Sequence, residues 1–244
     1  MKRFDYGDMA FSINGDGLSV ALANVKQPGI FSTSTPYYNK QAMQNMNGVK
    51  VFVIPETAKD ESLGKEYVVT DIAKGAFDCV SDVIEIHIPK TINKINWNFW
   101  KCVNLQRFVV SPNNKKYCAI DGVLYSKDKK VLIAYPNAKG SRYKIPNGVE
   151  EIANCAFKNT SIEHITASAT LQRIGQNAFY GCCQLEWIIN IPKSIVEVVD
   201  YQDPKRIHSA NPNCRMDNGL LTTFQALIQQ SQRKRLSRTV LLSL

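Results

Sequence analysis

Apolar positions recur along the middle of this chain in one short pattern. Each unit has two apolar residues three positions apart, then an Ala-Phe or other aromatic pair, and then a run of the form apolar-x-x-apolar-x-apolar. Units that follow one another without an insertion start 22 to 24 residues apart. The pattern occurs at residues 69–89, 92–110, 149–167 and 171–188, and a fifth unit that begins at Ile191 loses it.

This spacing falls within the roughly 20–29 residues of a leucine-rich repeat, whose units each supply a short strand and a turn or helical segment. So short a unit cannot bury its apolar side chains alone, so neighbouring units must stack and share a core. The predicted fold is therefore a leucine-rich-repeat solenoid. We expect a right-handed α/β-type coil dominated by β-strands, with turns or short helical segments between them.

One segment interrupts the repeats. Residues 117–136 read as two β-rich runs joined by a short polar turn, Ser126 to Lys130. This pattern predicts a β-hairpin insertion at about residues 111–140.

The repeated motif Ile-Pro-x-x-Val/Ile-x-x-Ile-x-x-x-Ala-Phe-x-x-Cys-x-x-Leu is complete or nearly so in four units from about residue 67 to 195. It resembles the BspA-like (Treponema pallidum type) leucine-rich-repeat family, as does the insertion. The β-rich N-terminal stretch is similar to the cap that precedes such arrays. The resemblance implies a cap at 1–66 and a repeat array at 67–199. Residues 200–244 lose the repeat and depart from the family, so we expect a non-repeat tail there.

The tail contains apolar residues at helical spacing between Gly219 and Arg235, with Asp217 or Asn218 as a possible N-cap. A capping helix over the last repeat is one interpretation. The others are a poorly ordered tail, a tail that is not native to the array, and a basic interaction helix.

The chain carries a formal net charge of +9. Residues 201–244 hold seven basic side chains against two acidic ones, and the remaining charge reads as spread thinly along the repeats. A solvated basic surface is the interpretation we prefer to an anionic partner, because nucleic-acid binders usually gather their basic residues into a patch with aromatics.

Seven cysteines are present, and several follow an aromatic residue of the repeat. An odd number and a repeated position favour a column of reduced, buried thiols over a disulfide framework or a metal site. The cysteines of this column are Cys79, Cys102 and Cys182.

Residues that could carry out a reaction are scarce. The chain has three histidines, none of them in a recognisable nucleophile motif with Ser or Cys, and no glycine-rich phosphate loop. We therefore expect no enzymatic activity, no cofactor and no metal. No apolar run reaches the roughly 18–20 residues of a membrane span, and no secretory signal is visible at the N-terminus.

Binding is the use that suits a solenoid, because outward strand residues line up from repeat to repeat. Aligning the units predicts two columns on one continuous sheet surface, with Trp187 as the strongest contact residue since Trp is enriched at interface hot spots. The first column is Glu85, Arg107, His164 and Trp187, and the second is His87, Val109, Thr166 and Ile189.

The family resemblance implies a bacterial cell-surface or secreted protein that contacts host proteins or other cells. We therefore expect a non-enzymatic protein-binding or adhesion module. The alternatives are a structural spacer within a larger surface protein and, less favoured, an anion or nucleic-acid binder that uses the basic tail.

Overall fold

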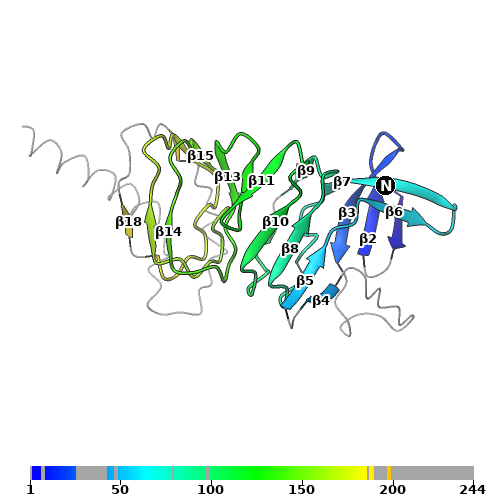
Figure 1. Ribbon diagram of the computed structural model, residues 1–244, viewed down its shortest axis with the longest axis horizontal. Coiled ribbons are helices and arrows are strands. Elements are labelled where there is room, and N and C mark those ends of the chain that lie inside the picture. Colours follow the sequence, from blue (N-terminus) through cyan, green and yellow to red (C-terminus); the bar gives the residue numbers. More distant parts are fainter. Residues whose placement is uncertain are drawn as a thin grey trace, which may run out of the picture.

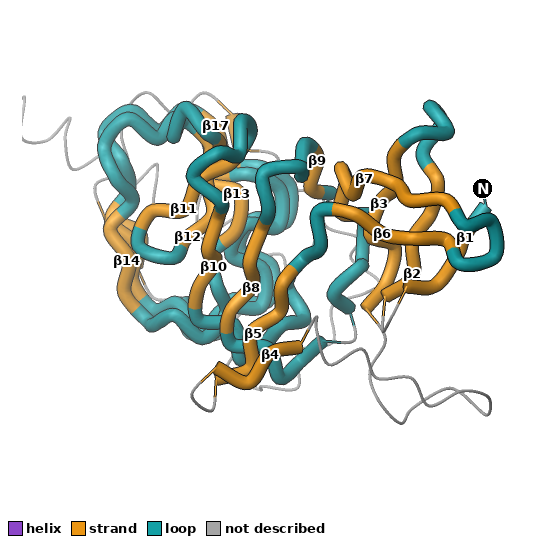
Figure 2. Tube along the Cα trace, turned by 45° about the vertical axis from the view of Figure 1, so that its right-hand side comes forward, coloured by secondary structure: helices purple, strands orange, loops and turns teal. Residues whose placement is uncertain are grey.

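The computed structural model describes residues 2–6, 9–25, 43–46, 49–78, 80–96, 99–185, 187–189 and 197–198. These residues form β-strands joined by turns, and they contain no helix (Figure 2). Turns therefore stand where the sequence allowed short helical segments. The tail with its expected helix lies outside the described residues.

The N-terminal sheet begins as an antiparallel meander and continues with strands from the first repeats. The meander pairs β1 with β2 and β2 with β3, whereas β3 pairs with β7 and β7 with β9 in parallel. Parallel pairing is the arrangement expected when each coil brings the chain back in the same direction. The strands are β1 (Arg3–Tyr6), β2 (Met9–Ile13), β3 (Ser19–Val25), β6 (Thr57–Asp60), β7 (Lys65–Ile72) and β9 (Lys94–Ile95).

A second sheet runs beside it, with β5, β8 and β10 lying side by side (Figure 1). The parallel pairing of β5 with β8 places a strand of the ladder at Val49–Val53, within the stretch that the sequence assigned to the cap. The strands are β4 (Met43–Met46), β5 (Val49–Val53), β8 (Glu85–Ile88) and β10 (Arg107–Val110).

Beyond the insertion the two ladders resume as two further sheets. Each of the later repeats gives one strand to each of them, and all the pairs between repeats are parallel. One sheet contains β11 (Tyr117–Ile120), β12 (Val123–Ser126), β13 (Val131–Ala134), β15 (Glu151–Ile152), β17 (Arg173–Ile174) and β19 (Glu197–Val198); the other contains β14 (Arg142–Lys144), β16 (His164–Thr166) and β18 (Trp187–Ile189).

The core contains rings from the aromatic positions of successive repeats, packed against one another. The Phe77 and Phe99 ring centroids are 5.1 Å apart, and those of Phe157 and Phe179 are 5.2 Å apart. Tyr135 extends this packing, with its centroid 5.0 Å from that of Phe157. Stacked rings at this spacing share buried surface between repeats, which is what a unit too short for its own core requires.

The cysteine column is confirmed at two of its three positions. Cys102 and Cys182 are buried, and each thiol donates to the carbonyl of the core Phe in the preceding unit, Phe77 or Phe157. None of the cysteines that the structure describes forms a disulfide. The third predicted position, Cys79, lies outside the described residues.

The insertion is a three-stranded meander rather than a two-stranded hairpin. β11 pairs with β12 across the Asp121–Gly122 turn, and β12 pairs with β13 across the predicted turn from Ser126 to Lys130. β13 then pairs with β15 and so belongs to the repeat ladder as well. The meander lies where the N-terminal and C-terminal halves of the repeat array would otherwise pair their strands directly.

β12 forms the wall between two hydrophobic clusters. Leu124 packs into the N-terminal cluster, while its neighbours Val123 and Tyr125 pack into the C-terminal one. Successive side chains of a strand point to opposite faces, so one strand can serve both cores. All three side chains are buried, as expected for a strand covered on both faces.

Candidate protein-binding face

The residues of the predicted face lie on the strands β8, β10, β16 and β18. Their registers pair neighbouring repeats as the sequence alignment predicts within each half of the molecule. Glu85 lies beside Arg107, His87 beside Val109, His164 beside Trp187 and Thr166 beside Ile189.

The predicted continuous surface is divided in two. Among the described strands, β10 pairs with β8 only, and β14 begins a separate sheet. The Asp121–Gly122 turn occupies the free edge of β10, where the Phe108 amide donates to the Gly122 carbonyl over 2.8 Å. We call the outward residues of β5, β8 and β10 strand patch 1, and those of β14, β16 and β18 strand patch 2.

Glu85 is buried, contrary to the expectation of an outward contact residue. Only 5% of the residue is exposed, and its carboxylate accepts hydrogen bonds from His87 Nε2 and Arg107 Nε. Burial by itself would raise the pKa of this carboxyl. The hydrogen bonds from His87 and Arg107 and the positive charge of Arg107 outweigh it, so the pKa lies below its ordinary value. Glu85 therefore anchors its two neighbours rather than meeting a partner.

The other predicted residues differ in how far they reach solvent. Arg107 and Val109 are exposed, and His87, His164 and Thr166 are half-buried. The side chains of Trp187 and Ile189 lie outside the described part, so only their backbone register is known.

Sequence reasoning missed two exposed residues of strand patch 2. Arg142 lies in register with His164, and Lys144 lies in register with Thr166. They belong to a repeat whose Ala-aromatic pair is Ala134-Tyr135, 22 residues before Ala156-Phe157. Accepting Tyr in place of Phe would have revealed this unit. It would also have extended both columns by one residue.

The described cysteines on the core side are poor nucleophiles. Burial raises the pKa of the Cys102 thiol to about 12, and the charge of Asp78 adds to this. Burial also raises the pKa of Cys155, although Lys158 and Lys74 oppose the shift. Such thiols stay protonated near neutral pH, so they act as small apolar groups. In the described part of the chain no cluster of His, Cys, Asp and Glu could hold a metal ion.

The repeats can now be compared with known families. The model of the BspA type leucine-rich repeat region matches six copies over residues 31–119 and 134–202. The chain belongs to this family. The match confirms the resemblance and the leucine-rich-repeat fold. Its interruption at residues 120–133 covers β12, the turns on either side of it and most of β13. The match also begins well before residue 67, consistent with β5 being a strand of the ladder.

Solved structures of bacterial leucine-rich-repeat proteins are similar to this BspA-type chain. One from Eubacterium ventriosum is 17% identical, with 90% of this chain and 83% of that chain covered and a TM-score of 0.40. The leucine-rich-repeat protein of T. pallidum is 14% identical, with coverages of 82% and 83% and a TM-score of 0.40. A leucine-rich cell surface protein from Faecalibacterium prausnitzii is 17% identical, with coverages of 77% and 54% and a TM-score of 0.40.

No curated protein matches the sequence. Within the residues that the structure describes, there is no helix with the length and apolar character to cross a membrane.

Proposed function

We propose that this BspA-type protein is a non-enzymatic protein-binding module that acts in adhesion at a bacterial cell surface. The observation that supports this most is the register of the strand patches, which sets outward side chains of successive repeats next to one another. Strands in a sheet lie about 4.8 Å apart, so these side chains form a surface with fixed spacing. Such a surface can bind a protein without rearranging.

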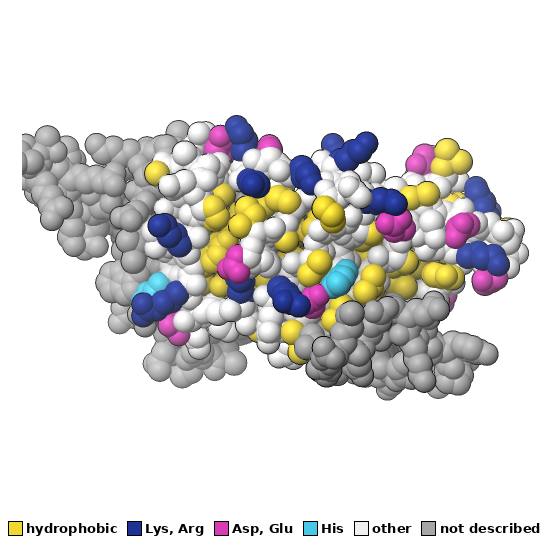
Figure 3. All heavy atoms as spheres, viewed as in Figure 1, with side chains coloured by type: hydrophobic (Ala, Val, Ile, Leu, Met, Phe, Trp, Pro, Cys, Tyr) yellow, Lys and Arg dark blue, Asp and Glu magenta, His cyan; other side chains and the backbone are white. Residues whose placement is uncertain are grey.

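Each patch offers a different chemistry. Strand patch 1 presents the side chain of Arg107, which bonds to the buried Glu85, and the exposed apolar side chain of Val109. Strand patch 2 presents Arg142 and Lys144 beside His164. Basic side chains in the lower part of the face are visible in Figure 3. A partner that covers patch 2 would therefore carry acidic side chains, because charge complementarity steers encounter and fixes register.

The location at the cell surface is taken from the family. The absence of a catalytic role is proposed because the described cysteines and histidines do not assemble into a nucleophile and base, and because the array has the form of a binding scaffold.

The test is capture of the full chain by a panel of immobilised, purified extracellular-matrix and serum proteins. We expect at least one panel member to retain the native chain. The backbone of Trp187 lies in register with that of His164, and Trp187→Ala should weaken the capture.

The spacer alternative gives the opposite result. A structural spacer has no ligand of its own, so no panel member would retain the native chain. Capture that Trp187→Ala leaves unchanged would remove Trp187 from the proposed contact surface.

A further inference from the structure

Five lysines lie together at one end of the insertion, where the sequence alone indicated charge spread thinly along the repeats. We call this group the lysine edge. It consists of Lys115, Lys116, Lys127, Lys129 and Lys130, all of them exposed.

The strand pairing of the insertion brings this group together. Tyr117 pairs with Ser126 at the end of the β11–β12 hairpin, and the Lys127 amide donates to the Lys116 carbonyl over 2.9 Å. Lys115 and Lys116 precede β11, while the other three lie in the turn after β12. In Figure 3 dark-blue side chains gather along the upper edge of the molecule, over the region of β9, β11 and β13.

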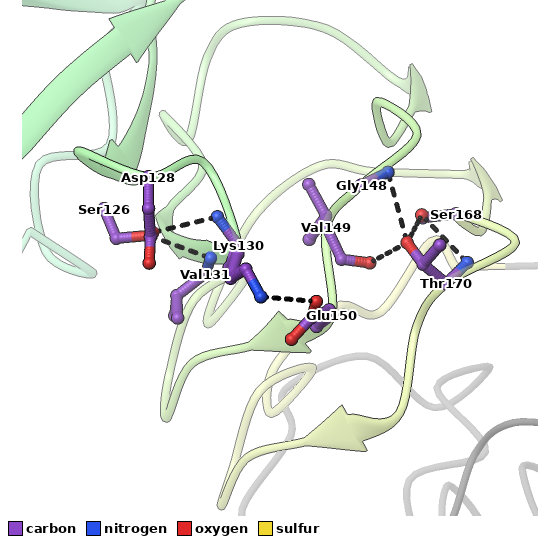
Figure 4. Close-up of polar contacts among 9 residues, drawn as sticks. All are labelled: Ser126, Asp128, Lys130, Val131, Gly148, Val149, Glu150, Ser168 and Thr170. Carbon is purple, nitrogen blue, oxygen red and sulfur yellow. Dashed lines mark hydrogen bonds and ion pairs between the residues drawn. The ribbon is translucent and has the colours of Figure 1, made fainter.

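The turn that presents three of these lysines is tied down by its own hydrogen bonds (Figure 4). The Asp128 carboxylate accepts from the Ser126 hydroxyl over 2.6 Å and from the Lys130 amide over 3.1 Å. The Val131 amide donates to the Ser126 hydroxyl over 2.9 Å. The lysine backbone is thus held in place before any ligand arrives, which lowers the entropy cost of binding.

Two carboxylates stand against the five lysines of the lysine edge, Asp128 within the turn itself and Glu150 beside it. Lys130 pairs with Glu150 over 2.9 Å, and Lys127 Nζ donates to the Pro112 carbonyl. Lys115, Lys116 and Lys129 form no ion pair among the described residues. Asp121, at the opposite end of the hairpin, pairs with Lys139 over 3.0 Å.

Lys129 occupies a backbone position that favours glycine. Its φ is +63°, in the left-handed region where a side chain with a Cβ costs roughly 1–2 kcal/mol. A lysine that bears this cost keeps a positive charge at a place where glycine would fold more favourably.

We propose that the lysine edge binds an acidic, sulfated polysaccharide, in addition to the protein bound by the strand patches. The group contains lysines only, which act as point charges and do not impose the planar, paired recognition that arginine provides. Between residues 111 and 131, all of which the structure describes, no aromatic side chain is exposed for stacking on bases, and no large apolar side chain is exposed for a lipid surface. A flexible polyanion is the partner that these features fit.

The experiment measures binding of heparin, as the probe, to the full chain over a range of salt concentrations. The test variant is Lys115→Ser with Lys116→Ser and Lys129→Gly. The control removes the same charge from surface ion pairs elsewhere, by Lys59→Ser with Lys90→Ser and Lys101→Ser. Both variants keep every basic residue of 201–244, so the tail contributes equally.

We expect the test variant to bind heparin at least about tenfold more weakly at low salt. Its salt dependence should be shallower, because fewer lysine contacts release fewer counterions on binding. The control should change by less than about twofold. Equal losses in the two variants, or no loss in either, would overturn the proposal. Tighter binding of a single-stranded DNA of similar length, lost in the same test variant, would overturn the assignment to a polysaccharide. Thermal melting of each variant checks that it remains folded.

Discussion

Gly122 lies where the insertion meets strand patch 1, and its lack of a side chain is a structural requirement. Its φ is +72°, and a Cβ there would lie 2.6 Å from the Cβ of Arg107. Both the backbone conformation and the close approach therefore disfavour any other residue. The turn that divides the binding face depends on this one position.

Gly122→Ala should destabilise the fold by about 2–4 kcal/mol, which combines the left-handed backbone with the clash. The matched control is Gly17→Ala, since Gly17 has a φ of +65° but no atom within 4 Å of its Cβ position. That variant should lose only about 1–2 kcal/mol. Urea unfolding of both variants measures the difference, and equal losses would show that the contact with Arg107 does not matter.

Glu85 makes stability depend on pH in a defined direction. The pKa of its carboxyl lies below the ordinary 4.5, because hydrogen bonds from His87 and Arg107 overcome the effect of burial. The ionised carboxylate therefore stabilises the fold above about pH 4.5, and the contribution is lost as the pH falls through the lower folded pKa.

Glu85→Gln should cost about 1–3 kcal/mol at neutral pH, the usual range for hydrogen bonds to a charged group. The difference from the native chain should shrink as the pH is lowered below about 4.5. Urea unfolding at a series of pH values measures it, with Glu61→Gln at an exposed carboxylate as the control. A difference that grows on acidification would contradict the assignment.

Periodicity predicts which strand residues point outward, but it does not predict their exposure. Glu85 alternates correctly with the buried Ile86, yet Arg107 of the next repeat and His87 of its own strand bond to its carboxylate. Those contacts depend on side-chain conformations that a pattern of apolar positions does not specify. For the same reason Arg107→Ala is not a neutral probe of binding, because it leaves a buried carboxylate with one partner fewer.

At the scale of elements, β12 joins the two halves of the core. Leu124→Ala should therefore cost about 2–5 kcal/mol, the range for a buried leucine whose neighbours cannot close the space. Leu18→Ala is the control, since Leu18 is 71% exposed and its loss should change stability by less than about 0.5 kcal/mol. Differential scanning calorimetry compares the two, and a small effect of Leu124→Ala would mean that β12 is not the shared wall.

The sequence identified the insertion but not its strand count. Val123, Leu124 and Tyr125 are all buried, so this strand has no alternation to mark it off, whereas the polar turn before Val131 is plain. The repeat that follows was hidden because Tyr135 takes the place of Phe at the aromatic position. A motif search misses a residue that packs in the same way but is of a different type, as Tyr135 is here.

At the scale of the whole molecule, two ladders of parallel strands run along the chain and are broken at one place by the meander (Figure 1). The break turns one expected binding surface into two patches and adds the lysine edge at one end of the insertion. A repeat array can therefore hold several surfaces of different chemistry while its core continues through β12.

The measurement that tests protein binding through the strand patches most directly is the dissociation constant of a protein retained by the capture panel. The face variant is Val109→Glu with Thr166→Glu, which places one charge on each patch and leaves Glu85 and its partners in place. The control is Val103→Glu with Leu63→Glu, at exposed apolar residues outside both patches. We predict that the face variant raises the dissociation constant at least about tenfold, while the control changes it less than about twofold. Val109→Glu puts a carboxylate into an apolar contact, and Thr166→Glu repels an acidic partner. Equal dissociation constants for the native chain and the face variant would contradict the account.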